Sequence, residues 1–313
     1  MPRVLFIGLG KMGSAMADRL VSTYDLAAYD VLPTAVQQLA EKGARTAEHP
    51  ADLATDAEVV ILSLPTSGDV AEVLFGRDGI TDVLAAGSLV IDMTSGDPAE
   101  STTIAASLAE RGIRFADAPV SGGRRGAIAG TLMIMVGADD ADADEVVELL
   151  TPLGEQVIHV GAIGAGHTMK LINNMLAVTN KVAALEAASL AIRCGIDPAT
   201  FVDVVNRSTG RSQATDTALS KFILPGRPHG MRLSLIQKDV SLARKLAEDQ
   251  GVHLACSSLA TGMMMSFDGG HKKGESDPPE SNDIALYFEQ QYGIELYGSL
   301  EDAATPGERP PPS

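Results

Sequence analysis

The fold of the N-terminal half is decided by the stretch Arg3-Val-Leu-Phe-Ile-Gly-Leu-Gly-Lys-Met-Gly-Ser-Ala-Met-Ala-Asp-Arg-Leu20. Its apolar run, residues 4–7, is typical of a buried parallel strand, and glycines follow it in G-x-G-x-x-G spacing before a helix-forming segment. Gly8 permits a tight turn, Gly10 lets the backbone approach a pyrophosphate, and Gly13 lets the helix pack on the strand. Unpaired N–H groups at the helix N-terminus favour the phosphates. The stretch therefore predicts a dinucleotide site formed by Gly8, Leu9, Gly10, Lys11, Met12 and Gly13.

Asp30 indicates which dinucleotide is bound. It ends a second strand-like run, residues 26–29, and lies 17 residues after Gly13. A carboxylate at this place accepts hydrogen bonds from the adenosine ribose hydroxyls and repels a 2′-phosphate. Residues 31–33 contain no Arg that would hold such a phosphate, so the sequence favours NAD over NADP. The alternative is that Asp30 only starts a turn before a helix.

Composition restricts the class of protein. A chain of 313 residues, 45% of them hydrophobic, fits two domains with aliphatic cores. The formal net charge of −17 argues against nucleic acid or an anionic membrane surface as a partner. Cys194 and Cys256 are too few for a disulfide framework and suit a reducing cytoplasm, where we expect the protein. Lys181 and Glu186 interrupt the most apolar helical stretch, which argues against a membrane span, and the six His show no spacing typical of a metal site.

Two domains of different class are expected. Up to about residue 162, short apolar strands alternate with helical segments, which predicts a mainly parallel sheet with helices on both faces. Strands are expected at 3–8, 26–30, 58–63, 88–93, 113–117, 132–137 and 156–160. Helical segments separate most of them, for example 33–42, 98–111 and 139–150. Residues 167–194 predict one long helix, followed by helices at 198–207, 212–222, 234–250, 254–267 and 282–292.

The predicted architecture is therefore an α/β Rossmann-type, doubly wound N-terminal domain, residues 1–163, joined by a long helix to an all-α C-terminal domain. The C-terminal domain, residues 164–300, is expected to serve substrate binding and oligomerisation. We expect a mobile loop at 269–281 and a disordered tail at 301–313.

A glycine-rich run, residues 117–131, leads out of the strand at 113–117. Ligands of an open α/β sheet bind beyond the carboxyl ends of its strands. Backbone N–H groups of this run, with the Ser121 hydroxyl, are therefore suited to hold a carboxylate. The alternative is a flexible surface loop.

Two lysines are candidates for the chemistry. Lys170, Asn173 and Asn174 lie at i, i+3 and i+4 of the long helix, so they project from one face among apolar neighbours. Partial burial there would lower the pKa of Lys170 towards the range of a general acid/base. A solvated Lys is the alternative, but after a dinucleotide domain we favour catalysis. Lys238, beside Asp239, either contacts the cofactor or a substrate anion, or is an ordinary exposed lysine.

Together these segments resemble the β-hydroxyacid dehydrogenase family, which includes 3-hydroxyisobutyrate dehydrogenase. The resemblance spans almost the whole chain in four ordered motifs, which are 8–13 with Met16-Ala17, 117–123 with 126–127 and 130–132, 164–166 with Lys170 and Asn173-Asn174, and Lys238-Asp239. It implies hydride transfer between NAD and a short, 3-hydroxyisobutyrate-like acid and its semialdehyde or oxo form. It also implies a homo-oligomer, a homodimer or homotetramer, formed through the helical domain.

The same resemblance implies a role for each site residue. Lys170 would be the catalytic acid/base, and Asn174 would position the substrate or the lysine. The nicotinamide half of the cofactor would be contacted by Leu64, Pro65, Thr94 and Lys238. The implied set that binds the carboxylate substrate consists of Ser121, Gly122, Gly123, Lys170, Asn173 and Asn174.

Other functions stay open at this point. Arg124 and Arg125 stand where many relatives carry small or apolar residues. Together with Lys170, Arg211 and Lys238 they favour a more anionic substrate, such as tartronate semialdehyde or sulfolactaldehyde, unless they point into solvent. A rival is an oxidative decarboxylase resembling 6-phosphogluconate dehydrogenase, although that family carries His where this chain has Asn173. Imine reductases usually replace the catalytic lysine, and a non-enzymatic NAD-binding protein would not need both Lys170 and Asn174.

Overall fold

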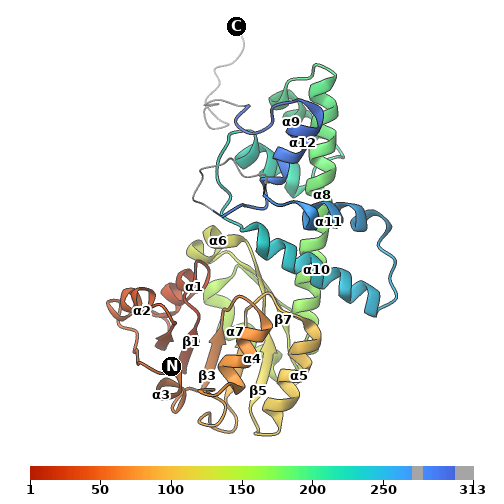
Figure 1. The fold of residues 1–313 in the computed structure, drawn as a ribbon. Helices are drawn as coiled ribbons and strands as arrows, with labels where there is room; N and C mark the ends of the chain where they lie inside the picture. The colour runs from red at the N-terminus through yellow and green to blue at the C-terminus, as the bar shows by residue number, and fades with distance from the viewer. Residues whose placement is uncertain (270–277, 300–313) are drawn as a thin grey trace. The chain divides into compact units, whose positions relative to one another are not determined.

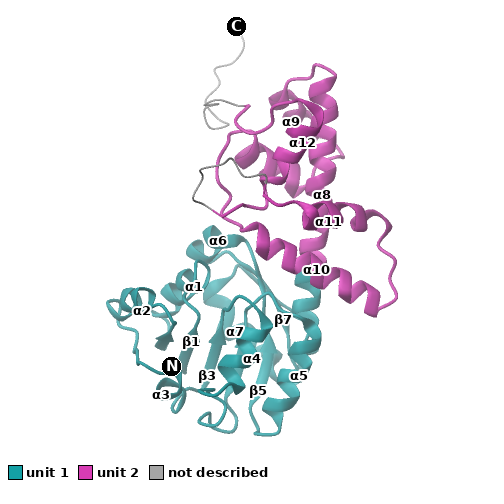
Figure 2. Ribbon diagram, viewed as in Figure 1, with its two compact units in different colours: residues 1–171 teal, residues 172–313 magenta. Residues whose placement is uncertain are grey.

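The computed structural model describes residues 1–269 and 278–299. The chain divides into two compact units, residues 1–171 and 172–313 (Figure 2). The predicted domain boundary, at 163/164, falls at the start of helix α8 (Ala165–Arg193), whereas the units divide within that helix. The predicted tail and most of the predicted loop at 269–281 lie outside the described residues.

The N-terminal unit is built on one sheet (Figure 1). Its strand order is β2-β1-β3-β4-β5-β7-β6, and β8 also pairs with β7. The first five strands of this order are parallel, whereas β7 runs antiparallel to β5 and β6 and parallel to β8. The later strands therefore lie on both sides of β1, with β2 on one side and β3, β4 and β5 on the other, as a doubly wound fold requires. The strands are β1 (Arg3–Ile7), β2 (Asp25–Tyr29), β3 (Val59–Leu62), β4 (Leu89–Asp92), β5 (Arg114–Asp117), β6 (Val120–Ser121), β7 (Met133–Gly137) and β8 (Gln156–Gly161).

Helices cover both faces of this sheet (Figure 1). Because successive strand residues point to opposite faces, Phe6 belongs to an apolar core with Met16 of α1, while Leu5 belongs to a second core with Leu74 of α4. The predicted Rossmann-type architecture is thereby confirmed. Its helices are α1 (Gly13–Leu20), α2 (Pro33–Ala40), α3 (Pro50–Ala54), α4 (Ser67–Phe75), α5 (Pro98–Ala109), α6 (Gly123–Ala129) and α7 (Asp140–Leu150), with a short 3₁₀ helix, η1 (Thr151–Leu153).

The glycine-rich run after β5 is more ordered than a loop. It forms the short strand β6 and then the helix α6, neither of which was predicted. Gly122 (φ +128°) and Gly130 (φ +73°) adopt backbone conformations that other residues rarely take, and they frame the helix. A Cβ on Gly126 would lie 3.1 Å from Leu132 Cδ2, so this glycine lets α6 pack closely. The flexible-loop alternative is therefore wrong for this run.

The C-terminal unit is helical, as predicted. It contains the later part of α8 with α9 (Pro198–Asn206), the π-helix η2 (Ala214–Ile223), α10 (Leu233–Asp249), α11 (Ala255–Ser266) and α12 (Ile284–Tyr292). By length and composition alone, α8 would be able to cross a membrane. However, Val178, Val182 and Leu185 of α8 are buried in the apolar core of this unit, which identifies α8 as a core helix.

Candidate active site

The predicted glycine turn lies at the carboxyl end of β1 and fits a dinucleotide. A Cβ on Gly13 would lie 1.8 Å from the Gly8 carbonyl oxygen, so α1 can approach β1 this closely only with glycine there. A Cβ on Gly10 would meet no described atom within 4 Å. The backbone at Gly10 is thus open to a bound group, as a pyrophosphate requires.

The start of α1 is also suited to an anion. Its N-cap residue, Met12, makes no side-chain capping bond, and the first turn carries no acidic side chain. The N-terminal N–H groups of this helix therefore favour a phosphate at its end. Lys11 is exposed beside the turn, whereas the Leu9 side chain is buried in the core, so Leu9 offers the cofactor only its backbone.

Asp30 follows β2 directly and braces the glycine turn. Its carboxylate accepts hydrogen bonds from the backbone N–H groups of Leu9 (2.5 Å) and Leu32 (2.8 Å). The Gly8 N–H donates to the Tyr29 carbonyl (3.0 Å), which joins the same two segments. Asp30 therefore does more than start a turn: its carboxylate is fixed beside the turn that would hold the pyrophosphate.

Leu64, Pro65 and Thr94, the predicted nicotinamide contacts, follow β3 and β4. The Leu64 N–H donates to the Thr94 hydroxyl oxygen (3.1 Å), and the Thr94 N–H donates to the Asp92 carboxylate (2.9 Å). The Thr94 carbonyl lies 2.9 Å from Nε2 of His167, a buried residue in the first turn of α8. Sequence reasoning gave His167 no role.

Asp117, the last residue of β5, fastens the N-terminus of α8 to the sheet. Its two carboxylate oxygens accept hydrogen bonds from the N–H groups of Gly164 and His167, both at 2.6 Å. Burial raises the pKa of Asp117, against the opposing effects of the nearby His167 and of these two amides. A carboxylate is favourable at a helix N-terminus, and here it holds the turn that precedes Lys170.

The structure buries Lys170 and Asn174, which lie one turn apart on α8. Lys170 is only 6% exposed, so the solvated alternative for this lysine is wrong. Asn174 donates through Nδ2 to the buried Asp239 carboxylate (2.7 Å) and accepts a longer bond from Asn173 (3.3 Å).

Asp239 is a residue that sequence reasoning quoted but left out of the site. Besides Asn174, it pairs with Lys238, whose Nζ lies 3.2 Å from its other carboxylate oxygen. Lys238 is thus a partly buried, paired lysine rather than an ordinary exposed one. Asp239 fixes two predicted site residues at once within the C-terminal unit.

The predicted carboxylate-binding segment lies between β6 and α6. Ser121 is half-buried, and Gly122 and Gly123 are exposed. Gly123 has a φ of +62°, and a Cβ there would meet no described atom within 4 Å, so its backbone is also open to a bound group. Arg124 and Arg125 follow on the exposed first turn of α6, whereas the exposed Arg211 pairs with Asp216 (3.3 Å).

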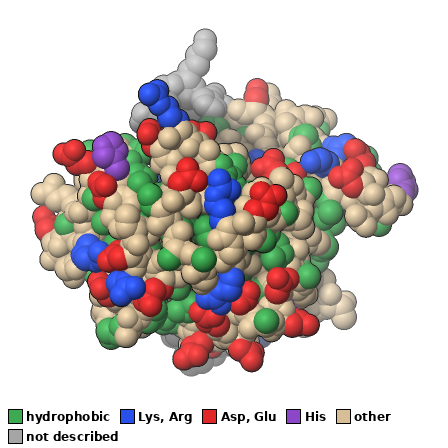
Figure 3. All heavy atoms as spheres, turned by 90° about the horizontal axis from the view of Figure 1, so that it is seen from below, with side chains coloured by type: hydrophobic (Ala, Val, Ile, Leu, Met, Phe, Trp, Pro, Cys, Tyr) green, Lys and Arg blue, Asp and Glu red, His purple; other side chains and the backbone are tan. Residues whose placement is uncertain are grey.

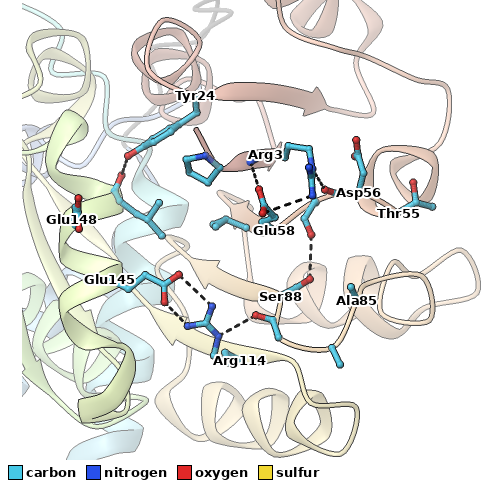
Figure 4. A pocket seen from close by; sticks show the side chains of 16 residues that line it. Arg3, Tyr24, Thr55, Asp56, Glu58, Ala85, Ser88, Arg114, Glu145 and Glu148 are labelled. Atoms are coloured by element: carbon cyan, nitrogen blue, oxygen red, sulfur yellow. Dashed lines mark hydrogen bonds and ion pairs between the residues drawn. The ribbon is translucent and has the colours of Figure 1, made fainter.

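A hollow of about 590 Å³ lies at the opposite, amino-terminal edge of the sheet (Figure 4). It is lined by charges that are already paired, Arg3 with Glu58 and Arg114 with Glu145. From below, the molecule shows acidic and basic side chains interspersed (Figure 3). Because ligands of open α/β sheets bind beyond the carboxyl ends of the strands, this hollow is not the candidate active site. Within residues 1–269 and 278–299, no group of three or more His, Cys, Asp or Glu is arranged to hold a metal ion.

Comparisons with known proteins find dehydrogenases over almost the whole chain. Residues 3–161 match the NAD-binding domain of 6-phosphogluconate dehydrogenase, and residues 164–279 match the NAD-binding domain of NADP-dependent 3-hydroxyisobutyrate dehydrogenase. The chain is 35% identical to 2-(hydroxymethyl)glutarate dehydrogenase of Eubacterium barkeri, over 95% of this chain and 98% of that protein. It is 37% identical to mitochondrial 3-hydroxyisobutyrate dehydrogenase of Mus musculus, over 86% and 83%.

A comparison with solved structures finds the same class of enzyme. The structure of Mycobacterium tuberculosis 3-hydroxyisobutyrate dehydrogenase with L-serine matches with a TM-score of 0.82 and 28% identity, over 92% of this chain and 99% of that one. The fold and these relatives define an oxidoreductase that binds NAD or NADP and acts on a hydroxyacid. The chain belongs to the β-hydroxyacid dehydrogenase family.

Proposed function

We propose that this protein transfers hydride between NAD and a short 3-hydroxyacid, such as 3-hydroxyisobutyrate, and its semialdehyde. The observation that carries the proposal is Lys170, a buried amine just after the point where Asp117 fastens α8 to the sheet. An enzyme that oxidises an alcohol needs a group to take the hydroxyl proton, and Lys170 is suited to this task. The names of the relatives support the substrate class.

The roles of the residues follow from this proposal. In the oxidation, the neutral amine of Lys170 takes the proton of the substrate hydroxyl while the carbon that bears this hydroxyl loses hydride. In the reduction, the ammonium of Lys170 returns the proton to the oxygen. NAD, when bound, supplies the hydride acceptor. Asn174, held by Asp239, positions the substrate, and Ser121, Gly122 and Gly123 bind its carboxylate. Positioning of this kind contributes several kcal/mol to lowering a barrier.

The experiment that tests the proposal is NAD reduction over a panel of 3-hydroxyacids, with Lys170→Ala as the central variant. We expect this variant to lose at least about 10²-fold in kcat, as for other general acid/base residues, and to bind NADH like the wild type. Lys221→Ala, which removes an exposed lysine of η2 outside the candidate site, is the matched control for turnover. Wild-type turnover in Lys170→Ala would remove Lys170 from the mechanism, and release of carbon dioxide from 6-phosphogluconate would favour an oxidative decarboxylase instead.

For the cofactor, the proposal specifies NAD rather than NADP. Asp30 supports this choice, because its carboxylate is fixed beside the glycine turn by Leu9 and Leu32. A 2′-phosphate placed near it would meet a negative charge. We expect kcat/KM to be higher with NAD than with NADP, and Asp30→Ser to narrow the difference. A wild-type preference for NADP would contradict this part of the proposal.

A second candidate substrate is a more anionic 3-hydroxyacid or semialdehyde, such as a dicarboxylate. Arg124 and Arg125 favour it, because they carry two positive charges at the start of α6, directly after the predicted carboxylate-binding residues. The relative named 2-(hydroxymethyl)glutarate dehydrogenase has a dicarboxylate in its name. Arg124→Ala with Arg125→Ala should then raise KM for 2-(hydroxymethyl)glutarate and leave KM for 3-hydroxyisobutyrate unchanged.

Assembly and location are further parts of the proposal. We expect a cytoplasmic homodimer or homotetramer that binds neither nucleic acid nor membranes. The identification of α8 as a core helix and the net charge of −17 support the absence of membrane and nucleic-acid partners. Exposed apolar residues on α8, Leu176 and Leu190 among them, support self-association.

A further inference from the structure

We infer that His167 is a positioning residue: its imidazole joins the turn that carries Thr94 to the turn of α8 that precedes Lys170. The inference rests on the proposed function, because it concerns where Lys170 stands relative to residues expected to contact the nicotinamide. It assigns a task to a buried, polar side chain that the proposed chemistry does not itself use.

The imidazole bonds two separate segments. Its Nε2 lies 2.9 Å from the Thr94 carbonyl oxygen, after β4, and its Nδ1 lies 2.7 Å from the Ser101 hydroxyl, on α5. A carbonyl oxygen only accepts, so Nε2 must carry a hydrogen for this bond to exist. The side chain is 0% exposed, so water does not compete for either bond.

The ring is also confined by packing. A Cβ on Gly96 would lie 2.8 Å from His167 Cε1 and 2.5 Å from Ser67 Oγ. The turn between β4 and α5 therefore fits directly against the imidazole, and only a glycine allows this approach. The same turn is also bonded to α4, because the Asp97 N–H donates to Ser67 Oγ (2.9 Å).

These contacts link Thr94, which is expected to contact the nicotinamide, to the turn of α8 that precedes Lys170. The Leu64 N–H donates to the Thr94 hydroxyl, the Thr94 carbonyl accepts from His167, and His167 precedes Lys170 by three residues on one helix. Residues at this spacing are neighbours on the helix surface. Asp117 holds the backbone of this turn, and the imidazole holds its distance from Thr94. Because an error of about 1 Å in placing reacting groups lowers a rate by about 10²-fold, this distance matters for the proposed reaction.

Two substitutions of His167 that should affect kcat differently test the inference. In His167→Gln the amide nitrogen reaches roughly the place of Nε2 and can still donate to the Thr94 carbonyl. In His167→Asn it reaches only the place of Nδ1, so the bond to Thr94 is lost. We expect kcat to fall by about tenfold or more in His167→Asn and to stay within about threefold of the wild type in His167→Gln. KM and the Kd for NADH should change little in either.

Equal kcat values in both variants, whether high or low, would overturn the inference, because a merely structural histidine would not distinguish them. Should His167→Asn fail to fold, Ser101→Ala provides a milder variant that removes the Nδ1 partner together with the longer bond from the Ser101 hydroxyl to the Asp97 carbonyl (3.2 Å). It should lower kcat less than tenfold without changing KM, and a wild-type kcat would contradict the inference.

A measurement on the wild-type protein keeps this inference separate from the proposed function. In ¹⁵N NMR spectra, the His167 imidazole, assigned by its loss in His167→Gln, should show a hydrogen on Nε2. An Nε2 without hydrogen would overturn the geometry whatever the enzyme does. If the wild type binds NADH but oxidises no 3-hydroxyacid, the proposed function fails. The rate at which an amine-acylating reagent modifies Lys170, followed by mass spectrometry, then replaces kcat and should change in His167→Asn but not in His167→Gln.

Discussion

Gly10 and Gly13 belong to the same glycine turn but have different roles, and substituting each by alanine distinguishes these roles. Gly10 has open space where a Cβ would be, whereas a Cβ on Gly13 would overlap the Gly8 carbonyl oxygen. Gly10→Ala should therefore fold like the wild type but raise the Kd for NADH by about tenfold or more, about 1.4 kcal/mol. Gly13→Ala should lower the free energy of unfolding by about 3 kcal/mol or more, because the overlap is with rigid backbone.

Thermal unfolding and NADH fluorescence measure the two effects separately. Each variant is the control for the other, since the chemical change is the same. Undiminished NADH binding by Gly10→Ala would show that no cofactor group approaches this part of the backbone.

Asp239 gives a second prediction for a single residue. Its carboxylate is buried between Asn174 and Lys238, so Asp239→Asn keeps the shape but removes the charge that faces Lys238. We expect kcat/KM to fall by about tenfold, since Asn174 loses a charged acceptor and Lys238 its counterion. Asp203→Asn is the matched control, because Asp203 pairs with Arg207 on an exposed helix surface (2.9 Å). Exposed pairs of this kind contribute little, so equal losses in both variants would contradict a special role for Asp239.

How far the sequence could predict these residues depends on where their partners lie. The strand, glycine turn and helix at 3–20 form a local pattern, and the spacing from Lys170 to Asn174 is local as well. His167 and Asp239 acquire their roles from partners distant in sequence: Thr94 lies 73 residues from His167, and Asn174 lies 65 from Asp239. No sequence pattern around His167 or Asp239 indicates these distant contacts.

The same distinction applies to the secondary-structure elements. All the predicted strands of the N-terminal unit are present within one or two residues. Most of them are buried parallel strands, which have continuous apolar runs. The strand β6 and the helix α6 were missed, since glycine-rich composition disfavours both elements. They form because Gly122 takes a positive φ and Gly126 packs against Leu132. The helix predicted at 212–222 exists, but as the π-helix η2, a geometry that residue composition does not distinguish from an α-helix.

A buried lysine couples two elements of the C-terminal unit and makes stability depend on pH. Lys181 of α8 donates to the Asn282 side chain (2.7 Å) and to Ser281 (3.1 Å), in the segment before α12. Burial lowers the pKa of Lys181 from 10.5 to about 8, although Asp283 and Glu280 oppose this effect. The folded protein therefore holds fewer protons than the unfolded chain between pH 8 and 10.5, and stability should rise with pH across this window.

The prediction is tested by comparing the wild type with Lys181→Met. The wild type should gain stability relative to this variant, by up to about 3 kcal/mol, as the pH rises from 8 to 10.5. Chemical unfolding of both proteins at several pH values measures the difference in their free energy of unfolding. The contributions of the other titrating groups cancel because they are the same in both proteins. Lys221→Met, which removes an exposed lysine of η2, should show no such trend. A flat difference for Lys181→Met would mean that Lys181 is as well solvated as Lys221.

At the scale of the whole molecule, the exposed side of α8 predicts self-association. Leu176, Ala183 and Leu190 recur at intervals of seven residues, so they lie along one side of the helix, and all three are exposed. Leu190 is 67% exposed. A second copy of the chain would cover this apolar side, and Leu190→Glu should shift the oligomer towards monomer because it would bury a charge in the contact.

Light scattering after size-exclusion chromatography measures the outcome, with Leu32→Glu as the control. Leu32 is 62% exposed and belongs to the N-terminal unit, so its substitution should leave the mass unchanged. Each copy carries a net charge of −17, so two copies repel each other and added salt should strengthen the wild-type association by screening that repulsion. A wild type that stays monomeric at high salt and high concentration would contradict the prediction. Dissociation of Leu32→Glu rather than Leu190→Glu would place the contact on the N-terminal unit instead.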